Sequence, residues 1–281
     1  MAYLPAHPEK ILWPSNMKLR KKNNMEILPI SSPLIKIGDD LFDVFCSALK
    51  KSGNKFDRKT CENSIIVIAS KVVSISEKRV IDLRKIKPGK RAKTLNFKRY
   101  SAYKPDPRFT ELALKESDKF WPNEMFLTVR DGIFAPSAGI DTSNIQENFA
   151  VLWPKNSYKS AEEFLKKIKN KFGIKNCGII ISDSFIAPLR AGVIAIALGY
   201  AGFEGVKNMR GKRDLFGKKL KTTSKNIADA LACSASVYIG ESNEKIPFAL
   251  IKNAPAKFTN KKSNAKEVKM PAGKCLYKAL Y

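Results

Sequence analysis

The chain has 281 residues, 44% of them hydrophobic, and can therefore bury a substantial core in one large or two modest domains. Its longest uncharged stretch, residues 191–203, is too short to cross a bilayer, and the N-terminus lacks a signal-peptide core, so we expect a cytoplasmic protein without a membrane partner. The 52 basic and 26 acidic residues give a net charge of +26, but the lysines are spread along the chain without a recognised nucleic-acid motif. A solvated basic surface that binds a smaller polyanion, such as a nucleotide, is the stronger interpretation, and nucleic acid is the weaker one.

Strand and helix patterns alternate through the first half of the chain. Apolar residues predict a short strand at residues 27–30, a helix at 39–50 and a buried, β-branched strand at 64–69. Residues 85–103 are basic and contain Pro88-Gly89, which predicts a surface segment that leads to a helix at 109–119.

The second half continues the alternation. Residues 125–129 and 133–135 flank Asp131-Gly132, a dipeptide that favours a hairpin turn. An amphipathic helix is predicted at 159–172 with Gly173 as its C-cap, followed by a buried strand at 178–182, an apolar segment at 193–201 and a helix at 226–238. This order predicts an α/β or mixed α+β fold.

Composition divides the chain into three parts. Residues 1–24 are basic, irregular and contain several prolines, which indicates an N-terminal extension. Residues 25–255 hold the regular pattern and are predicted to form the enzyme domain. Residues 256–281 form a basic C-terminal segment.

Carboxylates follow apolar, strand-like segments at two places. Asp141 follows Ala138-Gly139-Ile140, and Asp183 follows residues 178–182, while Glu241 comes after Gly240. Carboxylates at strand ends are where α/β proteins build their sites, and ligand sets made only of oxygen suit magnesium or manganese. The alternative for each residue alone is the cap of a helix or turn.

Other kinds of chemistry find little support in the sequence. Five cysteines without a CxxC pair and a single histidine, His7, argue against zinc sites and histidine-based triads. Residues 211–218 have one residue too many for a P-loop, and the GxGxxG fingerprint is absent. A bound nucleotide would therefore be held by a metal, by Lys or Arg side chains and by backbone amides.

A series of short segments occurs in a fixed order along residues 27–252. These segments are Leu34-Ile35-Lys36, Gly38-Asp39-Asp40, residues 67–74, residues 138–141 with Ser143-Asn144, residues 178–184, Arg190 with Gly192-Val193, Arg210-Gly211, residues 214–217, Ala228-Asp229, and Gly240-Glu241 before Ile246-Pro247. In this order they resemble the coenzyme F-420 γ-glutamyl ligase family.

The resemblance implies a metal-dependent reaction driven by GTP. An acceptor carboxylate would become an acyl phosphate, and the amine of L-glutamate would then displace the phosphate to form an amide. It also implies the family's γ-glutamyl ligase-type fold, an intertwined α/β homodimer. The implied cofactors are Mg²⁺ or Mn²⁺, with GTP or ATP as co-substrate and K⁺ as a further candidate ion.

The resemblance also implies roles for particular residues. The metal site would consist of Asp141, Asp183, Ser184 and Glu241. The nucleotide pocket would consist of Pro33, Leu34, Ile35, Ser70, Lys71 and Asn144. Catalysis is expected to depend on Asp141, Asp183 and Arg190.

Three positions depart from the family's pattern. Ile75 stands where the family has a lysine that contacts the nucleotide phosphate, Phe185-Ile186-Ala187 lacks the family's glycine and arginine, and Ser137 replaces an asparagine. We expect a remodelled site in which Lys71, Lys78 or Arg190 takes over part of the anion binding.

These departures leave two questions open. The acceptor could be coenzyme F-420-0 or another glutamate-bearing cofactor such as a folate. The alternative to an enzyme is a non-catalytic nucleotide- and metal-binding protein on the same scaffold.

Overall fold

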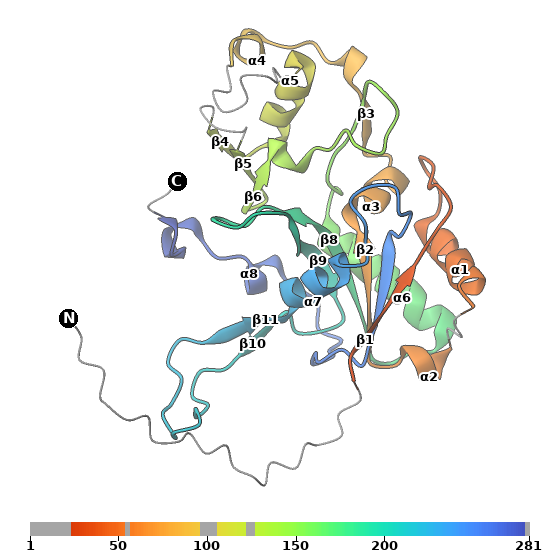
Figure 1. The fold of residues 1–281 in the computed structure, drawn as a ribbon, viewed down its shortest axis with the longest axis vertical. Helices are drawn as coiled ribbons and strands as arrows, with labels where there is room; N and C mark the ends of the chain where they lie inside the picture. Colours follow the sequence, from red (N-terminus) through yellow and green to blue (C-terminus); the bar gives the residue numbers. More distant parts are fainter. Residues whose placement is uncertain (1–23, 54–56, 96–105, 122–126, 279–281) are drawn as a thin grey trace, which may run out of the picture.

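The structure, a computed structural model, describes residues 24–53, 57–95, 106–121 and 127–278 (Figure 1). Four predictions fall at least partly outside the described residues: the N-terminal extension with His7, residues 96–103 of the surface segment, residues 125 and 126 of the hairpin, and residues 279–281 of the C-terminal segment.

A five-stranded mixed sheet forms the centre of the fold, in the order β1-β12-β2-β8-β9. Its strands are β1 (Glu26–Ile30), β12 (Phe248–Lys252), β2 (Ser64–Ala69), β8 (Cys177–Phe185) and β9 (Ile194–Ala201). Strands β2 and β8 run parallel, whereas the other neighbours in this sheet are antiparallel. The central strands are apolar nearly throughout, as expected for a sheet that is buried on both faces.

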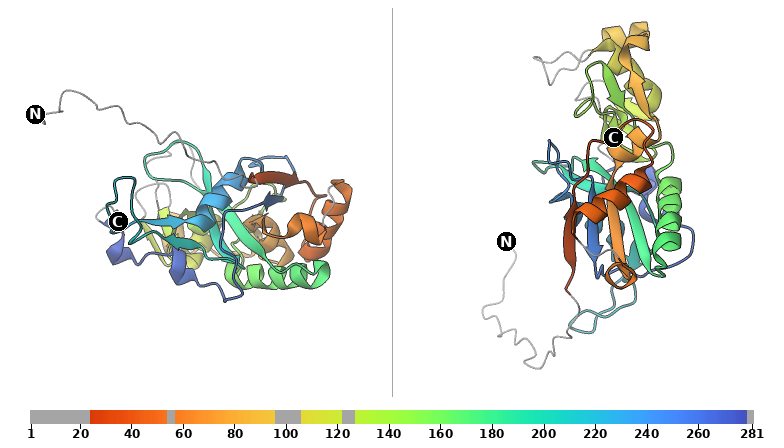
Figure 2. Two further views of the ribbon diagram at one scale, coloured as in Figure 1. Left: turned by 90° about the horizontal axis from the view of Figure 1, so that it is seen from below. Right: turned by 90° about the vertical axis from the view of Figure 1, so that its right-hand side faces the viewer.

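Helices cover both faces of this sheet (Figures 1 and 2). One face carries α1 (Leu41–Lys51), α3 (Ser70–Ser76) and α6 (Ser157–Phe172), which pack on alternate residues of β2 and β8 such as Ile66 and Ile179. The other face carries α7 (Ile227–Ser236), which packs on the intervening residues such as Ile65 and Ile180. The period of two in the strands thus assigns each residue to one of two apolar clusters.

A smaller region adjoins the central sheet and has its own apolar cluster around Leu112 and Leu152. It contains a three-stranded antiparallel sheet of β4 (Lys119–Trp121), β5 (Leu127–Arg130) and β6 (Ile133–Pro136). Its remaining elements are β3 (Val80–Asp82), which pairs with β7 (Phe149–Val151), the helices α4 (Lys90–Thr94) and α5 (Pro107–Glu116), and the 3-10 helices η1 (Leu83–Lys85) and η3 (Ser137–Gly139).

A hairpin arm extends from the central sheet (Figures 1 and 2). Its base is the pair β10 (Val206–Asn208) and β11 (Ser224–Asn226), and residues 209–223 connect them. Leu215 and Phe216 in this connection are 83% and 89% exposed. Large apolar side chains are therefore presented to solvent at the end of an arm.

The C-terminal segment lies against the central sheet. Thr259 N donates to Gly202 O at 2.9 Å, and Tyr200 hydrogen-bonds to Glu267 in the short helix α8 (Ala265–Val268). The short helices α2 (Arg58–Cys61) and η4 (Ala272–Lys274) complete the described elements. Within the described ranges, no helix combines the length and the apolar character needed to span a bilayer.

Most predicted elements are confirmed, and the mixed α/β class with them. The Asp131-Gly132 turn has φ angles of 51° and 70°, as a type I′ hairpin turn requires, and Gly173 ends α6 with φ 64°. The predicted bounds of the helix at 109–119 are wrong, because α5 spans Pro107–Glu116. Asp106 caps its start by accepting a hydrogen bond from Arg108 N, and residues 119–121 form β4 instead.

Candidate functional site

The parallel pairing of β2 with β8 sets up the site. Ala69, the last residue of β2, lies opposite Ser182 in the register, so Ser70 after the strand lies beside Asp183, which is still in β8. Ser70 Oγ donates to Asp183 Oδ1 at 2.7 Å. Two predicted site residues separated by 113 positions are therefore in direct contact at the carboxyl edge of the parallel pair.

Asp183 is a partly buried carboxylate with two donors. Its second oxygen, Oδ2, accepts a hydrogen bond of 2.5 Å from Trp153 Nε1. Burial raises the pKa of Asp183 to about 6, although the hydrogen bonds from Ser70 and Trp153 lower it, and the charge of Asp141 raises it further. The ionised form therefore lacks full compensation, and a cation beside it would stabilise that form.

Asp141 belongs to a tight polar loop beside Asp183. Lys71 Nζ lies 2.5 Å from Asp141 Oδ2 and also donates to Ser143 Oγ at 2.9 Å. Ser143 N donates to Asp141 Oδ1 at 2.6 Å. Burial raises the pKa of Asp141, but Lys71 and Ser143 together outweigh it, so the pKa of Asp141 is lowered overall and the group is ionised at neutral pH.

The loop at 241–245 closes the other side of the strand end. Ser184 Oγ donates to Glu241 Oε1 at 2.6 Å, and Asn144 Nδ2 donates to Ser242 O at 2.7 Å. Ser32 N donates to Lys245 O at 2.9 Å, which ties the loop after β1 to the same place. Segments from five parts of the sequence therefore meet at one edge of the sheet.

The predicted metal ligands divide between the two sides of β8. Successive strand residues point to opposite faces, so Asp183 lies toward Asp141 and Ser184 toward Glu241. Among the residues that the structure describes, no three or more His, Cys, Asp or Glu side chains already form a cluster with metal-ligand geometry. The side-chain atoms of the predicted metal ligands are all oxygens, the ligand type that Mg²⁺ and Mn²⁺ prefer.

Comparison with known proteins places the chain in one family. The family model for F420-0:Gamma-glutamyl ligase matches residues 29–253. The chain is 38% identical over 245 residues to the coenzyme F420:L-glutamate ligase of Methanococcus maripaludis, covering 86% of this chain and 93% of that relative. It is 35% identical over 249 residues to the coenzyme F420:L-glutamate ligase of Methanocaldococcus jannaschii, covering 87% and 94%. The chain belongs to the F420-0:gamma-glutamyl ligase family. Both the predicted family and the predicted enzyme class, an amide-forming acid–amino-acid ligase, are confirmed.

The predicted nucleotide residues of the ligase differ in how they could contact a ligand. Pro33 and Leu34 are exposed in the loop after β1, whereas Ile35 is 8% exposed and packs in the core. Ile35 can thus offer a ligand only its backbone. Ser70 and Lys71 already contact Asp183 and Asp141, so a nucleotide would have to share them with those carboxylates.

The structure also locates the departures from the family's pattern. Ile75 is a residue of α3, is 8% exposed and packs in the core, so its side chain points away from solvent. Lys78, just after that helix, passes beside Gly38, where a Cβ would lie 3.2 Å from Lys78 Cε. Arg190 lies with Ala187 in the loop between β8 and β9 and is exposed, and within the described ranges it forms no ion pair with Asp141 or Asp183. Of the three suggested substitutes, Lys71 is the one in contact with a predicted metal ligand.

Sequence reasoning missed Trp153, the residue that holds Asp183 from the side opposite Ser70. A Cβ on Gly139, which has φ 69°, would lie 2.1 Å from Trp153 Cε2, so glycine is required where the indole passes. Arg79 Nε donates to Trp153 O at 3.2 Å, and the Arg130 guanidinium lies 5.6 Å from the ring centroid. A lone tryptophan outside any recognised segment gave no signal in the sequence.

Proposed function

We propose that this chain joins the amino group of L-glutamate to a carboxylate of coenzyme F-420-0, in a reaction driven by GTP and dependent on Mg²⁺ or Mn²⁺. The two relatives described above are named for L-glutamate ligation on this coenzyme. The observation that carries the proposal is the placement of Asp141 and Asp183, with Lys71 and Ser70, on one side of β8 and of Glu241, with Ser184, on the other side at the same edge of the sheet.

The proposed reaction has two balanced steps. An oxygen of the acceptor carboxylate attacks the γ-phosphorus of GTP, and the bond from that phosphorus to the bridging oxygen breaks. GDP departs, and the acceptor is now an acyl phosphate. The lone pair of the glutamate nitrogen then attacks the acyl carbon, the bond to the phosphate oxygen breaks, and the nitrogen gives up a proton. The products are an amide and inorganic phosphate, and both steps place negative charge on phosphoryl oxygens.

The chain's own residues would position this chemistry. Lys71, held by Asp141 and Ser143, supplies a cation that can be shared with a phosphate. Asp183 is fixed in orientation by Ser70 and Trp153, with both oxygens already defined in space. Fixed groups of this kind stabilise developing charge without having to reorganise during the reaction.

The residues fit a divalent cation. The raised pKa of Asp183 reflects a buried negative charge that the surrounding protein does not fully balance. Asp141 and Asp183 would hold a cation on one side of β8, and Ser184 and Glu241 would hold one on the other. When bound there, the metal would neutralise the charge of the transferred phosphoryl group.

We also propose a homodimer in which a second copy covers the hairpin arm. Leu215 and Phe216 are almost fully exposed on a segment that extends from the central sheet (Figure 1). Adjacent exposed side chains of this size commonly mark an interaction surface.

Product mass spectrometry tests the proposed ligation. The full-length protein would be incubated with L-glutamate, GTP or ATP, Mg²⁺ or Mn²⁺, with and without K⁺, and either F-420-0 or a folate as acceptor. We expect F-420-0 to gain glutamyl mass only when GTP and a metal are present. Asp183→Asn and Asp141→Asn should lower turnover by about a hundredfold or more, whereas Glu163→Gln, an exposed carboxylate on α6, should not.

One outcome would replace the proposal with its alternative. If the wild-type protein binds GTP and metal but adds glutamate to neither acceptor, the chain is a non-catalytic nucleotide- and metal-binding protein. Tight oligonucleotide binding without nucleotide binding would instead favour a nucleic-acid partner.

A further inference from the structure

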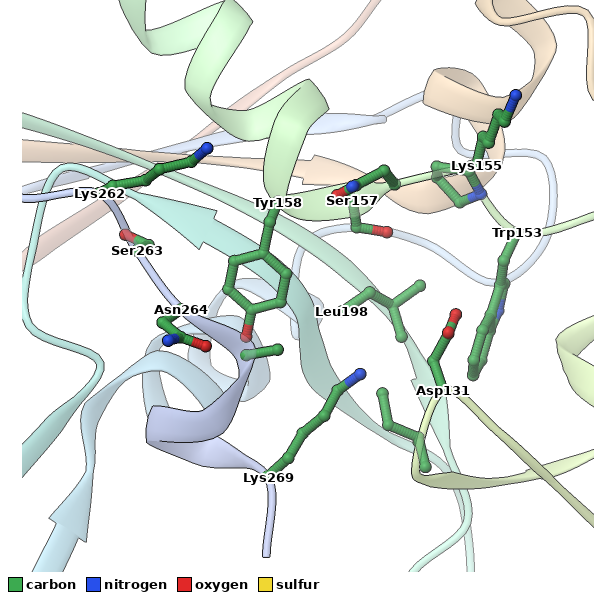
Figure 3. A pocket seen from close by; sticks show the side chains of 14 residues that line it. Asp131, Trp153, Lys155, Ser157, Tyr158, Leu198, Lys262, Ser263, Asn264 and Lys269 are labelled. Carbon is green, nitrogen blue, oxygen red and sulfur yellow. The ribbon is translucent and has the colours of Figure 1, made fainter. Parts of the chain in front are cut away.

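A polar cavity is lined in part by Trp153, whose indole also donates to Asp183 (Figure 3). Its volume is about 490 Å³, which suits a small molecule. The walls come from the β5–β6 turn, the start of α6, strand β9 and the C-terminal segment around α8. Because Trp153 lines this cavity and also donates to Asp183, the cavity and the candidate site share one wall.

The fold builds this cavity from close backbone contacts. A Cβ on Gly199 of β9 would lie 2.4 Å from the backbone carbon of Ser157, so the start of α6 can lie directly on the strand. A Cβ on Gly132 would lie 3.8 Å from Lys269 Cδ, which places the lysine stem alongside the hairpin turn. The cavity is thus formed by segments held against one another on several sides.

The charges around the cavity follow a specific pattern. Lys155, Lys262 and Lys269 line it together with a single carboxylate, Asp131 (Figure 3). Lys262 Nζ lies 3.9 Å from Glu162, at the limit of an ion pair, whereas in the part of the chain that the structure describes Lys155, Lys269 and Asp131 form no ion pair. Several cationic groups and one anionic group therefore remain to be matched by a ligand.

We infer that this cavity binds free L-glutamate, with its two carboxylates at the lysines and its ammonium group at Asp131. This inference rests on the proposed function, because that reaction needs a site for an amino acid beside the activated acceptor. An acceptor chain that ends in glutamate also has carboxylates, but its nitrogen is in an amide. An amide nitrogen carries no positive charge and cannot form an ion pair with Asp131. Figure 3 shows Asp131 on the same side of the cavity as Trp153, which places the amino group toward the wall shared with Asp183.

Calorimetric titration of the full-length protein with L-glutamate tests the site independently of turnover. We expect Lys269→Gln and Asp131→Asn each to weaken L-glutamate binding about tenfold or more, since each removes a charge-assisted contact. The matched control Lys266→Gln alters an exposed lysine of α8 that does not line the cavity and should bind as the wild type does. Glutarate has both carboxylates but no ammonium group, so Lys269→Gln should weaken glutarate binding and Asp131→Asn should not.

The same variants in the glutamylation assay separate this inference from the proposed function. Under the inference, Lys269→Gln raises the KM for L-glutamate while the KM for GTP stays unchanged. If the wild type adds glutamate and neither substitution changes glutamate binding or its KM, the cavity is not the glutamate site although the proposed function stands. If the variants lose glutamate binding as expected but no product forms with any acceptor, the site stands and the proposed function fails. Loss of acceptor binding without loss of glutamate binding would overturn the inference.

Discussion

Gly139 shows how one residue without a side chain supports the site. The indole of Trp153 occupies the space where a Cβ would lie, and that indole donates to Asp183. We expect Gly139→Ala to destabilise the protein by about 2–5 kcal/mol, because it adds both a steric clash and backbone strain at φ 69°. It should also lower ligase activity, since a displaced Trp153 no longer holds Asp183.

Gly173 provides the matched control for that substitution. It has a similar φ of 64°, but a Cβ there would meet nothing within 4 Å. Gly173→Ala should therefore lower the free energy of unfolding by about 1 kcal/mol, from backbone strain alone, and leave the activity unchanged. Chemical denaturation and turnover measured on both variants give the comparison, and equal losses for the two would contradict the role of Trp153.

Ser137 is a residue in an unfavourable conformation. Its φ of 50° lies in the left-handed region, where asparagine is tolerated better than serine. We expect Ser137→Asn to stabilise the protein by about 0.5 kcal/mol, and Ser137→Val to destabilise it because β-branched residues fit this region poorly. Thermal unfolding midpoints that change in the same direction for both variants would contradict this explanation.

At the scale of elements, Glu116 at the end of α5 holds two strands in place. Its Oε2 lies 3.0 Å from Arg79 before β3 and 2.8 Å from Arg130 at the end of β5, and Arg130 is only 8% exposed. Glu116→Gln should destabilise the protein by about 3 kcal/mol, because it leaves a buried guanidinium without its counter-charge. Lys159 and Glu163 form an exposed pair 3.7 Å apart, so Glu163→Gln should change the denaturation free energy by less than about 0.5 kcal/mol.

Elements with a strong local pattern could be predicted from the sequence. Strand β2 was expected at its observed bounds because a β-branched run is specific for a buried strand, and α6 because its apolar residues follow the helical period. Candidate residues at strand ends could also be found, since Ser70 and Asp183 follow such runs. Their contact could not, because it depends on the register between β2 and β8.

The elements that were missed depend on distant partners. Strand β12 is short, and its position between β1 and β2 is set by pairing with residues 180 to 226 positions away. Strands β3, β7, β10 and β11 have three residues each, too few for a periodic signal. The same reason applies to Trp153, whose role comes from three-dimensional packing against Gly139.

At the scale of the whole molecule, the hairpin arm provides a test of the proposed homodimer. We expect the wild type to elute as a dimer in size-exclusion chromatography with light scattering, and the double variant Leu215→Ser, Phe216→Ser to be a monomer. Leu276→Ser, which changes a side chain that is 88% exposed elsewhere, is the control and should remain dimeric. A wild-type monomer, or a double variant that stays fully dimeric, would show that the arm does not make this contact.

The place of β12 in the sheet has a consequence for synthesis on the ribosome. Strand β1 pairs with β12, and β12 also covers one edge of β2, so the N-terminal strand cannot find its neighbour until residues 248–252 have been translated. Until then the nascent chain carries the isoleucine-rich edge of β2 unpaired, a template for pairing with other chains. Pairings this far apart in sequence also close slowly. The growing polypeptide is thus open to aggregation through β2 until the last strand of the sheet has been translated.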